Sequence, residues 1–345
     1  MKVGIAFDLK TDFSPGPLSL AGGGAGQPED LFEEYDSEET VEAIAKAIRA
    51  AGHETVMLGG GRRFLELLLR APPDIVFNIA EGRGSRSREA HVPAACEMLS
   101  VPYTHSDPLT LAVTLDKHVA KRLVASYGLS TPAFVLLERA EDLGSAELPP
   151  FPLIAKLAFE GSSMGIRRHS RADDRDALEA KIRWLFAEYR QPVLVEQFLT
   201  GPEVTAGILG NEQPHVLGLM EIAPRRGSCE DFIYSLEVKR NYLEEVDYHV
   251  PPRLPQATLR ALERLALGAY RALGCRDVAR VDMRLGPDQR PYFLEVNPLP
   301  GLNPVTGDLP IMAARAGWTY DRLIREILAA ALARLAAQAA EPTRT

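Results

Sequence analysis

Long apolar stretches, paired cysteines and clustered basic residues are scarce in this chain of 345 residues. No apolar run reaches the roughly 18 to 20 residues that a membrane-spanning helix needs, and the first residues lack the features of a signal peptide. The three cysteines, Cys96, Cys229 and Cys275, are far apart and odd in number, so they predict neither a disulfide framework nor a metal site. We therefore expect a cytoplasmic protein with no membrane partner.

Two further features are absent from the sequence, and their absence argues against two classes of function. The net charge is −8 with no basic block, which argues against binding to the phosphates of a nucleic acid. The segment after the first apolar run, residues 7–12, lacks the Gly-x-Gly-x-x-Gly pattern of dinucleotide-binding oxidoreductases, and no P-loop pattern occurs.

The composition is that of an ordinary globular protein, with 46% hydrophobic and 25% charged residues. At about 150 residues per domain, the length predicts two or three domains. In the first third, strands alternate with helices, which predicts a parallel sheet covered by helices on both faces. The expected strands are 3–7, 54–58 and 74–79, and the expected helices are 37–51, with Ser37 as its N-cap, 64–69 and 88–99. The intervening loop 10–36, with glycines at 22–24, is long enough to be functional or mobile.

The pattern changes after a helix predicted at 116–127. Strands bounded by prolines and one helix favour a small α+β domain, with strands at 133–137, 152–157 and 193–198 and the helix at 177–189. A third region follows, with strands predicted at 203–209, 215–222, 279–285 and 291–296 and helices at 256–273 and 320–337. We therefore divide the chain into domains 1–104, 105–199 and 200–345.

Polar residues in the last predicted strand pair suggest a metal site. Arg280 and Asp282 share one face of their strand, as do Glu295 and Asn297 of theirs. If the strands are antiparallel neighbours, Asp282, Glu295 and Asn297 form a cluster of oxygen ligands, which selects Mg²⁺ or Mn²⁺. The alternative is a surface strand pair with Arg280 bound to Asp282, and it is disfavoured by the apolar neighbours Phe293, Leu294 and Val296.

Two other segments have the composition of a nucleotide site. Residues 159–165 are rich in glycine and serine and follow a strand that ends in Lys156, so their N–H groups and hydroxyls suit phosphate oxygens. A mobile hairpin is the alternative. In the apolar strand 194–199, Glu196 suits a base amine and Leu199 a base face, while Glu203 suits a ribose hydroxyl. Solvated turn carboxylates are the alternative there.

Seven segments in order resemble the ATP-grasp fold and, within it, the D-alanine–D-alanine ligase family. They are VPYT (101–104), TLDK (114–117), Lys156 with EGSSMG (160–165), VEQFLTGPEVT (195–205), ARVD (279–282), FLEVNPLPG (293–301) and MAARAG (312–317). The resemblance implies a parallel-sheet N-terminal α/β domain and two α+β domains that clasp the nucleotide. It also implies a cytoplasmic, homodimeric ligase that uses ATP and two Mg²⁺ ions to join amino acids through an acyl phosphate, by default two D-alanines.

The resemblance assigns roles to individual residues. The nucleotide-binding set is Lys117, Lys156, Ser162, Ser163, Glu196, Gln197, Leu199, Glu203, Lys239 and Leu294. The Mg²⁺ ligands are Asp282, Glu295 and Asn297. The catalytic set comprises Arg280 and the Gly301 N–H, which stabilise the tetrahedral oxyanion, together with Ser162 and the closing-loop lysine Lys239.

The chain departs from the family pattern at the amino-acid end of the site. Glu81-Gly82 replaces the usual His-Gly pair, residues 85–90 replace a Gly-Glu-Asp-Gly run, and the usual Glu-Val-Ser is absent from the loop that carries residues 33–38. Asp308 lies where a serine for the substrate carboxylate is expected, and an acid there would repel a carboxylate.

These departures leave alternatives open for substrate binding. Glu81 is predicted to bind an ammonium group, and Arg86 or Arg88 to meet a substrate acid, although a solvated loop charge is the alternative for both arginines. Either Thr306 binds the substrate carboxylate in place of the usual serine, or the acceptor is not D-alanine. A ligase for a different pair of substrates and a nucleotide-binding protein without turnover are the alternative functions.

Overall fold

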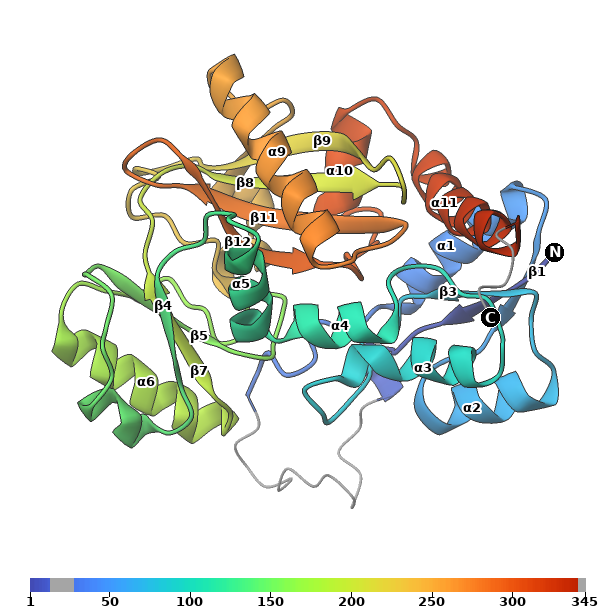
Figure 1. Cartoon of the computed structure of the whole chain (residues 1–345), viewed down its shortest axis with the longest axis horizontal. Helices are drawn as coiled ribbons and strands as arrows, with labels where there is room; N and C mark the ends of the chain where they lie inside the picture. The colour runs from blue at the N-terminus through green and yellow to red at the C-terminus, as the bar shows by residue number, and fades with distance from the viewer. Residues whose placement is uncertain (13–27, 341–345) are drawn as a thin grey trace.

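The computed structural model describes residues 1–12 and 28–340, and in these residues the chain forms three sheets (Figure 1). The predicted long loop falls partly outside them, including its glycines at 22–24. The short 3₁₀ helix η1 (Lys10–Asp12) precedes the gap.

The first sheet is parallel, as predicted, and its strand order is β2-β1-β3. Its strands are β1 (Lys2–Ala6), β2 (Glu54–Met57) and β3 (Ile75–Asn78), and its helices are α1 (Glu38–Ala50), α2 (Gly61–Arg70) and α3 (His91–Met98). The Ser37 hydroxyl accepts a hydrogen bond from the Thr40 N–H at 3.4 Å, which confirms the predicted N-cap of α1. The predicted helix 88–99 is instead divided into the 3₁₀ helix η2 (Arg88–Ala90) and α3.

The second sheet is antiparallel, with order β4-β7-β5-β6. It comprises β4 (Phe134–Leu137), β5 (Leu153–Leu157), β6 (Arg171–Ala172) and β7 (Val193–Gln197), with η3 (Ala140–Gly144) between β4 and β5. Helix α6 (Arg175–Tyr189) covers one face by burying Leu178, Ile182 and Leu185 against it. The other face is therefore free to line a site.

The third sheet has order β10-β9-β8-β11-β12 and is antiparallel throughout. Its strands are β8 (Glu203–Leu209), β9 (His215–Pro224), β10 (Val246–His249), β11 (Val278–Leu285) and β12 (Pro291–Asn297). Helix α9 (Gln256–Ala272) packs on it through Leu262, Leu265 and Ala269. Strand β10 and three short helices were not predicted from the sequence; the helices are α7 (Leu236–Arg240), α8 (Tyr242–Glu245) and α10 (Asp308–Arg315).

Three helices connect the sheets. The predicted helix 116–127 is α5 (Lys117–Ser126), which Asp116 caps and which follows the unpredicted α4 (Pro108–Leu115). Figure 1 shows α5 beside β12, and its Ala120 and Val124 share a core with the third sheet. Helix α11 (Tyr320–Ala340) packs on α1, so the last helix contributes to the core of the first sheet. The division at 104/105 and 199/200 stays a prediction.

Among the described residues, no helix is long and apolar enough to cross a membrane.

Candidate active site

A cavity between the second and third sheets contains most of the side chains predicted to bind a nucleotide. We refer to this partly open space as the first cavity. The predicted residues that line it are Lys117, Lys156, Ser163, Glu196, Gln197, Leu199, Glu203, Lys239 and Leu294. Apolar walls come from Ile154, Leu157 and Ile222. A pocket with apolar walls and converging cations suits a nucleotide, whose base is apolar on its faces and whose phosphates are anionic.

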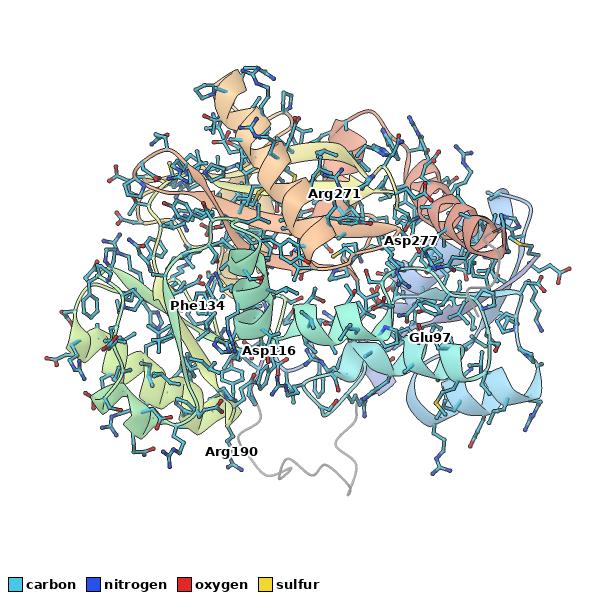
Figure 2. All side chains as sticks on the ribbon, in the orientation of Figure 1. Glu97, Asp116, Phe134, Arg190, Arg271 and Asp277 are labelled. Carbon is cyan, nitrogen blue, oxygen red and sulfur yellow. The ribbon has the colours of Figure 1, made fainter. Side chains whose placement is uncertain are left out.

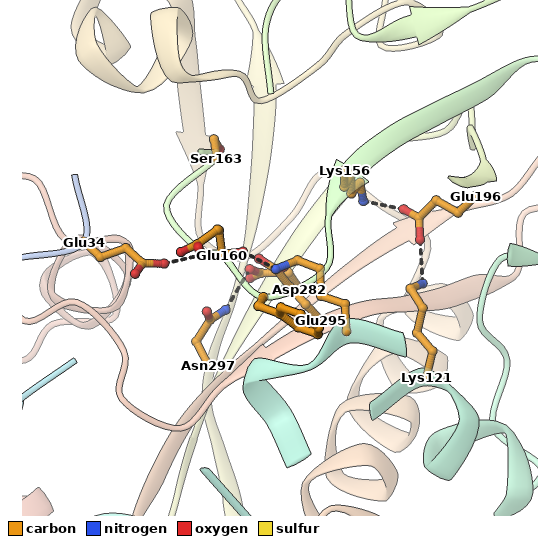
Figure 3. Close-up of polar contacts among 12 residues, drawn as sticks. Glu34, Lys121, Lys156, Glu160, Ser163, Glu196, Asp282, Glu295 and Asn297 are labelled. Carbon is orange, nitrogen blue, oxygen red and sulfur yellow. Dashed lines mark hydrogen bonds and ion pairs between the residues drawn. The ribbon is translucent and has the colours of Figure 1, made fainter. Parts of the chain in front are cut away.

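Two lysines bind the same buried carboxylate beside this cavity. Glu196 on β7 pairs with Lys156 on β5 and, at 2.8 Å, with Lys121 on α5 (Figure 3). Burial would raise the pKa of Glu196, but the two ammonium groups outweigh it and hold the pKa below its usual value. The carboxylate assigned to the base is thus held in place by Lys156 and by a lysine that the sequence analysis missed.

Lys121 could have been found from helical spacing. It lies four residues after Lys117 in α5, and residues four apart share one face of a helix. Its side chain is only 1% exposed, and burial lowers the pKa of the ammonium group even though Glu196 raises it.

The glycine- and serine-rich segment forms a strained loop over the cavity. Ser162 and Ser163 both adopt left-handed backbone conformations, with φ of 48° and 60°. Such residues cost about 1 to 3 kcal/mol each and persist only where contacts hold them. Ser163 donates a hydrogen bond to the Tyr234 carbonyl at 2.9 Å, and the Gly161 N–H donates to Glu34. The loop is therefore bound to the 230s segment and to the N-terminal region at once.

The predicted metal ligands lie side by side on antiparallel strands. Asp282 of β11 is paired with Glu295 of β12, and Arg280 with Asn297, so all four side chains share one face (Figure 3). A bulge leaves Leu294 as an extra residue, which is why Leu294 and Glu295 both line the first cavity although neighbours in a regular strand face opposite sides.

The donor set fits a hard divalent cation. Two carboxylates and one amide converge here, whereas no group of three or more His, Cys, Asp or Glu suitable for a metal occurs in residues 1–12 and 28–340. The Asn297 amide donates to Asp282 at 3.2 Å, and a half-turn about its last bond would present its oxygen instead. Burial would raise the pKa of Glu295, but Lys117, Lys156 and Arg280 lower it to about 2, so the ligand is ionised.

Arg280 pairs with two carboxylates. Its Nε and Nη2 donate to Asp282 at 2.9 and 2.8 Å, and its Nη1 lies 3.4 Å from Asp308 Oδ2. The ion pair with Asp282, which was part of the alternative interpretation, therefore exists. The surface location proposed with it is wrong, because Arg280 is buried and Phe293 and Val296 of the adjacent strand are core residues.

A second cavity adjoins the first and reaches the N-terminal region. The predicted residues Ser162, Gly301, Glu81, Thr306 and Asp308 line it, as does Asn297. Lys117, Lys239, Arg280, Glu295 and Asp308 line both cavities. The groups predicted for phosphate transfer and for amide formation therefore meet at one boundary.

The two arginines predicted to bind a substrate acid line neither cavity. Arg86 is exposed and pairs with Asp116 at 2.7 Å. Arg88 is buried and donates to Glu34 at 2.6 Å and Glu160 at 3.0 Å. Both side chains hold protein carboxylates in place, and Arg88 joins the N-terminal loop to the glycine-rich loop.

Further carboxyl groups, which the sequence did not predict, line the second cavity. Glu34 and Asp36, in the loop before α1, line it together with Glu89. Burial raises the pKa of Asp36 to about 7 and that of Glu89 to about 8. The run of acidic residues just before Ser37 indicated that carboxyl groups lie near here. It did not show which of them faces the cavity, because the path of a loop cannot be read from its sequence.

Comparison with known proteins decides the family. A family model described as D-ala D-ala ligase C-terminus matches residues 123–329. The D-alanine–D-alanine ligase of Pelotomaculum thermopropionicum is 33% identical over 304 residues, which covers 85% of this chain and 91% of that protein. The chain belongs to the D-alanine–D-alanine ligase family. Another member, the D-alanine–D-alanine ligase of Synechococcus sp., is 34% identical over 312 residues, 88% of this chain and 91% of that protein.

Solved structures of ligases share the fold. The D-alanine–D-alanine ligase of Bacillus anthracis complexed with ATP superposes with a TM-score of 0.70 at 21% identity, covering 98% of this chain and 99% of that one. A D-Ala:D-Ser ligase from Enterococcus faecalis gives 0.68 at 21% identity, covering 96% and 99%. These likenesses confirm the ATP-grasp fold expected for a member of the D-alanine–D-alanine ligase family.

Proposed function

We propose that the protein is an ATP-dependent ligase that forms a peptide bond through an acyl phosphate. The family default is the synthesis of D-alanyl-D-alanine, and D-alanine is our proposed donor of the activated carboxylate. One observation carries the proposal: Lys117, Arg280 and Glu295 line both cavities. A nucleotide's terminal phosphate in the first cavity would meet a carboxylate in the second at these residues.

The first chemical step brings two anions together. A carboxylate oxygen attacks the γ-phosphorus of ATP, and ADP leaves. Lys117, Lys156 and Lys239 surround this point and offset the repulsion. We propose that Asp282, Glu295 and Asn297 hold Mg²⁺, two ions as in the family pattern, with Mn²⁺ as a substitute. Bound there, the cation would neutralise phosphate charge.

In the second step an amine attacks the acyl phosphate, and phosphate leaves. Negative charge then develops on the former carbonyl oxygen, and Arg280 and the Gly301 N–H are the proposed groups that stabilise it. Water would destroy the acyl phosphate, so the site must be covered. The contact between Ser163 and the Tyr234 carbonyl closes the glycine-rich loop against the 230s segment in the structure.

The location and the oligomeric state that we propose are those expected from the family resemblance. We propose a cytoplasmic homodimer that acts on small amino-acid substrates. Sedimentation equilibrium should give twice the chain mass of 37.8 kDa, and a single-chain mass would contradict the dimer.

Phosphate release from ATP tests the proposed function. The purified protein with Mg²⁺ is mixed with D- and L-amino acids, singly and in pairs, and product masses are measured. We expect release to depend on an amino acid and a condensed product to accumulate. Release that no amino acid or small amine stimulates would instead favour a nucleotide-binding protein without turnover, and a product without D-alanine would favour a ligase for another pair.

A further inference from the structure

One segment of the N-terminal region, residues 28–36, binds both ends of the glycine-rich loop. The Gly161 N–H donates a hydrogen bond to Glu34, and the Gly165 N–H donates one to Asp30 at 2.9 Å. Two acids that are four residues apart in the 28–36 segment therefore hold two glycines that are four residues apart in the loop. The strained serines of the loop lie between these two contacts, which is where backbone strain needs support.

Asp30 is a fully buried carboxylate that lies outside the cavities. It is 0% exposed, and it lines neither the first nor the second cavity. Besides the Gly165 N–H, it accepts hydrogen bonds from Arg167 Nη1 at 2.9 Å and from the Tyr189 hydroxyl at 2.8 Å. Removing a carboxylate from water is costly unless such donors take the place of water. The N-terminal segment is thus anchored at the end of the glycine-rich loop by a group that no substrate would touch.

The backbone of Gly165 is held on its other side as well. Lys181 of α6, which is 7% exposed, donates from Nζ to the Gly165 carbonyl at 3.1 Å, and Nζ lies 3.9 Å from the centre of the Trp184 ring. Burial and the nearby Arg167 lower the pKa of this lysine to about 7. Gly165 itself has a φ of 72°, and a Cβ there would lie 3.0 Å from the Leu185 side chain. The end of the loop is therefore fixed in position and conformation.

The 28–36 segment also lines the amino-acid side of the site. Its members in the second cavity are Glu33, Glu34, Tyr35 and Asp36. Gly161 of the glycine-rich loop lines both cavities. A ligand that fixes the 28–36 segment from the second cavity therefore also fixes the loop over the first, and such coupling acts equally in both directions.

We propose that Asp30 and Lys181 are positioning residues, which hold the glycine-rich loop closed over the ATP phosphates while the amino-acid side is filled. The inference rests on the proposed function. Without these contacts the loop opens and water reaches the acyl phosphate. A water oxygen then bonds to the acyl carbon, the bond from that carbon to the phosphate oxygen breaks, and the donor carboxylate, inorganic phosphate and a proton are released. ATP is consumed and no amide forms.

The ratio of phosphate released to amide formed tests this. The enzyme receives ATP, Mg²⁺ and the amino acids that stimulate phosphate release, D-alanine by default, and both products are quantified. We expect close to one phosphate per amide for the wild-type protein. Asp30→Asn and Lys181→Met should each raise the ratio at least threefold and also raise the KM for ATP, since the loop no longer stays closed. Lys181→Met keeps the length of a buried side chain, so it decides alone if Asp30→Asn does not fold.

Tyr189→Phe separates positioning of the loop from general stability. It removes the hydroxyl that binds Asp30 from α6 and leaves the bonds of Asp30 to Gly165 and Arg167. It should lower the free energy of unfolding in urea and leave the ratio and the KM for ATP unchanged. Asp176→Asn, in the exposed first turn of α6, is the control for a surface charge and should change none of the three.

Three results would count against the inference. A folded Asp30→Asn or Lys181→Met protein with the wild-type ratio overturns it. So does a Tyr189→Phe protein whose ratio rises as much as theirs, because the effect would then follow stability alone. In both cases the wild-type protein still forms the amide, and the proposed function stands. A wild-type protein that forms no amide from any amino acids overturns the proposed function and the inference together.

Discussion

Single side chains in this site are held by opposite charges and by hydrogen bonds to neighbouring protein groups. Asp282 accepts hydrogen bonds from Thr205 at 2.6 Å, from Asn297 and from Arg280. Such a network fixes the carboxylate before any ligand arrives, which is what a cation site and a transition state require.

Neutralising one carboxylate of this network should abolish most turnover. For Asp282→Asn we expect kcat to fall at least a hundredfold, because cation binding depends on charge and geometry together. Phosphate release measures kcat, and the far-ultraviolet dichroism spectrum should be unchanged. Asp288→Asn, in the exposed turn between β11 and β12, is the matched control. Near-normal turnover in Asp282→Asn would remove the metal assignment.

Removing the cation should have the same effect as removing its ligands. Excess chelator is expected to reduce amino-acid-dependent phosphate release at least a hundredfold, and Mg²⁺ or Mn²⁺ added back should restore it, since the donors are all oxygens. Full activity in chelator would show that Asp282, Glu295 and Asn297 serve another purpose.

The buried Lys121 should matter more for folding than its distance from the reacting groups suggests. Lys121→Met leaves Glu196 with Lys156 as its one cationic partner, and breaking a buried ion pair costs about 3 to 5 kcal/mol. Urea unfolding should show this loss, together with a higher KM for ATP. Lys46→Met, on the exposed face of α1, should change neither. A Lys121→Met protein as stable as wild type would contradict the account of Glu196.

The sequence predicted which side chains lie together when they are on regular strands, but not when they are in loops. Alternate residues of a strand share one face, and β11 and β12 are neighbours, so Asp282 was correctly expected to lie beside Glu295 and Asn297. Glu34 and Arg88 meet through a loop whose path no periodicity fixes, and their contact joins residues 54 positions apart. That is why Arg88 was assigned to a substrate when it binds a protein carboxylate.

At the scale of elements, the last helix stabilises the first sheet. Ile324 and Ile327 of α11 are fully buried in the core that contains Ile44 and Ile48 of α1. The ends of the chain are thereby joined across the parallel sheet, as the adjacent positions of α1 and α11 in Figure 1 show.

Shortening one of these buried side chains tests whether the contact between α1 and α11 stabilises the fold. Ile327→Ala is expected to lower the free energy of unfolding by about 2 to 5 kcal/mol, since a large aliphatic side chain is lost from a packed core. Arg325→Ala, two residues earlier and exposed, should change it by less than about 0.5 kcal/mol. Urea titration measures both. Equal effects would mean that α11 does not stabilise the core.

Length decided which elements could be predicted. Helices such as α1 and α9, of 13 and 17 residues, have enough turns for a periodic apolar face, and Ser37 marks one start. Helices α7 and α8 have 5 and 4 residues, and β10 has 4. Such short elements depend on tertiary contacts, so their own sequence carries little signal.

In the whole molecule, one buried carboxylate joins three segments that lie far apart in the sequence. Asp277, labelled in Figure 2, accepts hydrogen bonds from the His105 N–H at 2.8 Å and from Arg334 of α11 at 2.9 Å. His105 itself is fully buried, and burial, with Arg334 nearby, lowers the pKa of its imidazole from 6.5 to about 3.

This histidine should make the folded protein sensitive to acid. Below pH 6.5 the imidazole binds a proton in the unfolded chain, but in the folded chain it does so only near pH 3. The free energy of unfolding is therefore highest above pH 6.5 and falls as the pH drops. The loss is about 1.4 kcal/mol per pH unit. His105→Asn should remove one proton's worth of this slope between about pH 6 and pH 4 in urea titrations. Parallel curves for the two proteins would contradict the buried neutral imidazole.

The order of motifs predicted the overall architecture, because each segment of an ATP-grasp chain has a fixed place in the fold. The sequence did not show that α5 packs on the third sheet or that α11 packs on the first, since those choices depend on complementary apolar faces far apart in the chain.

We infer that a carboxylate accepts phosphate from ATP at the boundary of the two cavities, and an oxygen label can follow this transfer. A donor amino acid carrying ¹⁸O in both carboxylate oxygens is turned over with unlabelled ATP, and the released inorganic phosphate is analysed by mass. We expect one ¹⁸O atom in each phosphate, because the carboxylate oxygen that attacks phosphorus stays bound to phosphorus when the amine displaces the phosphate. Unlabelled phosphate from a reaction that still yields the amide would contradict it.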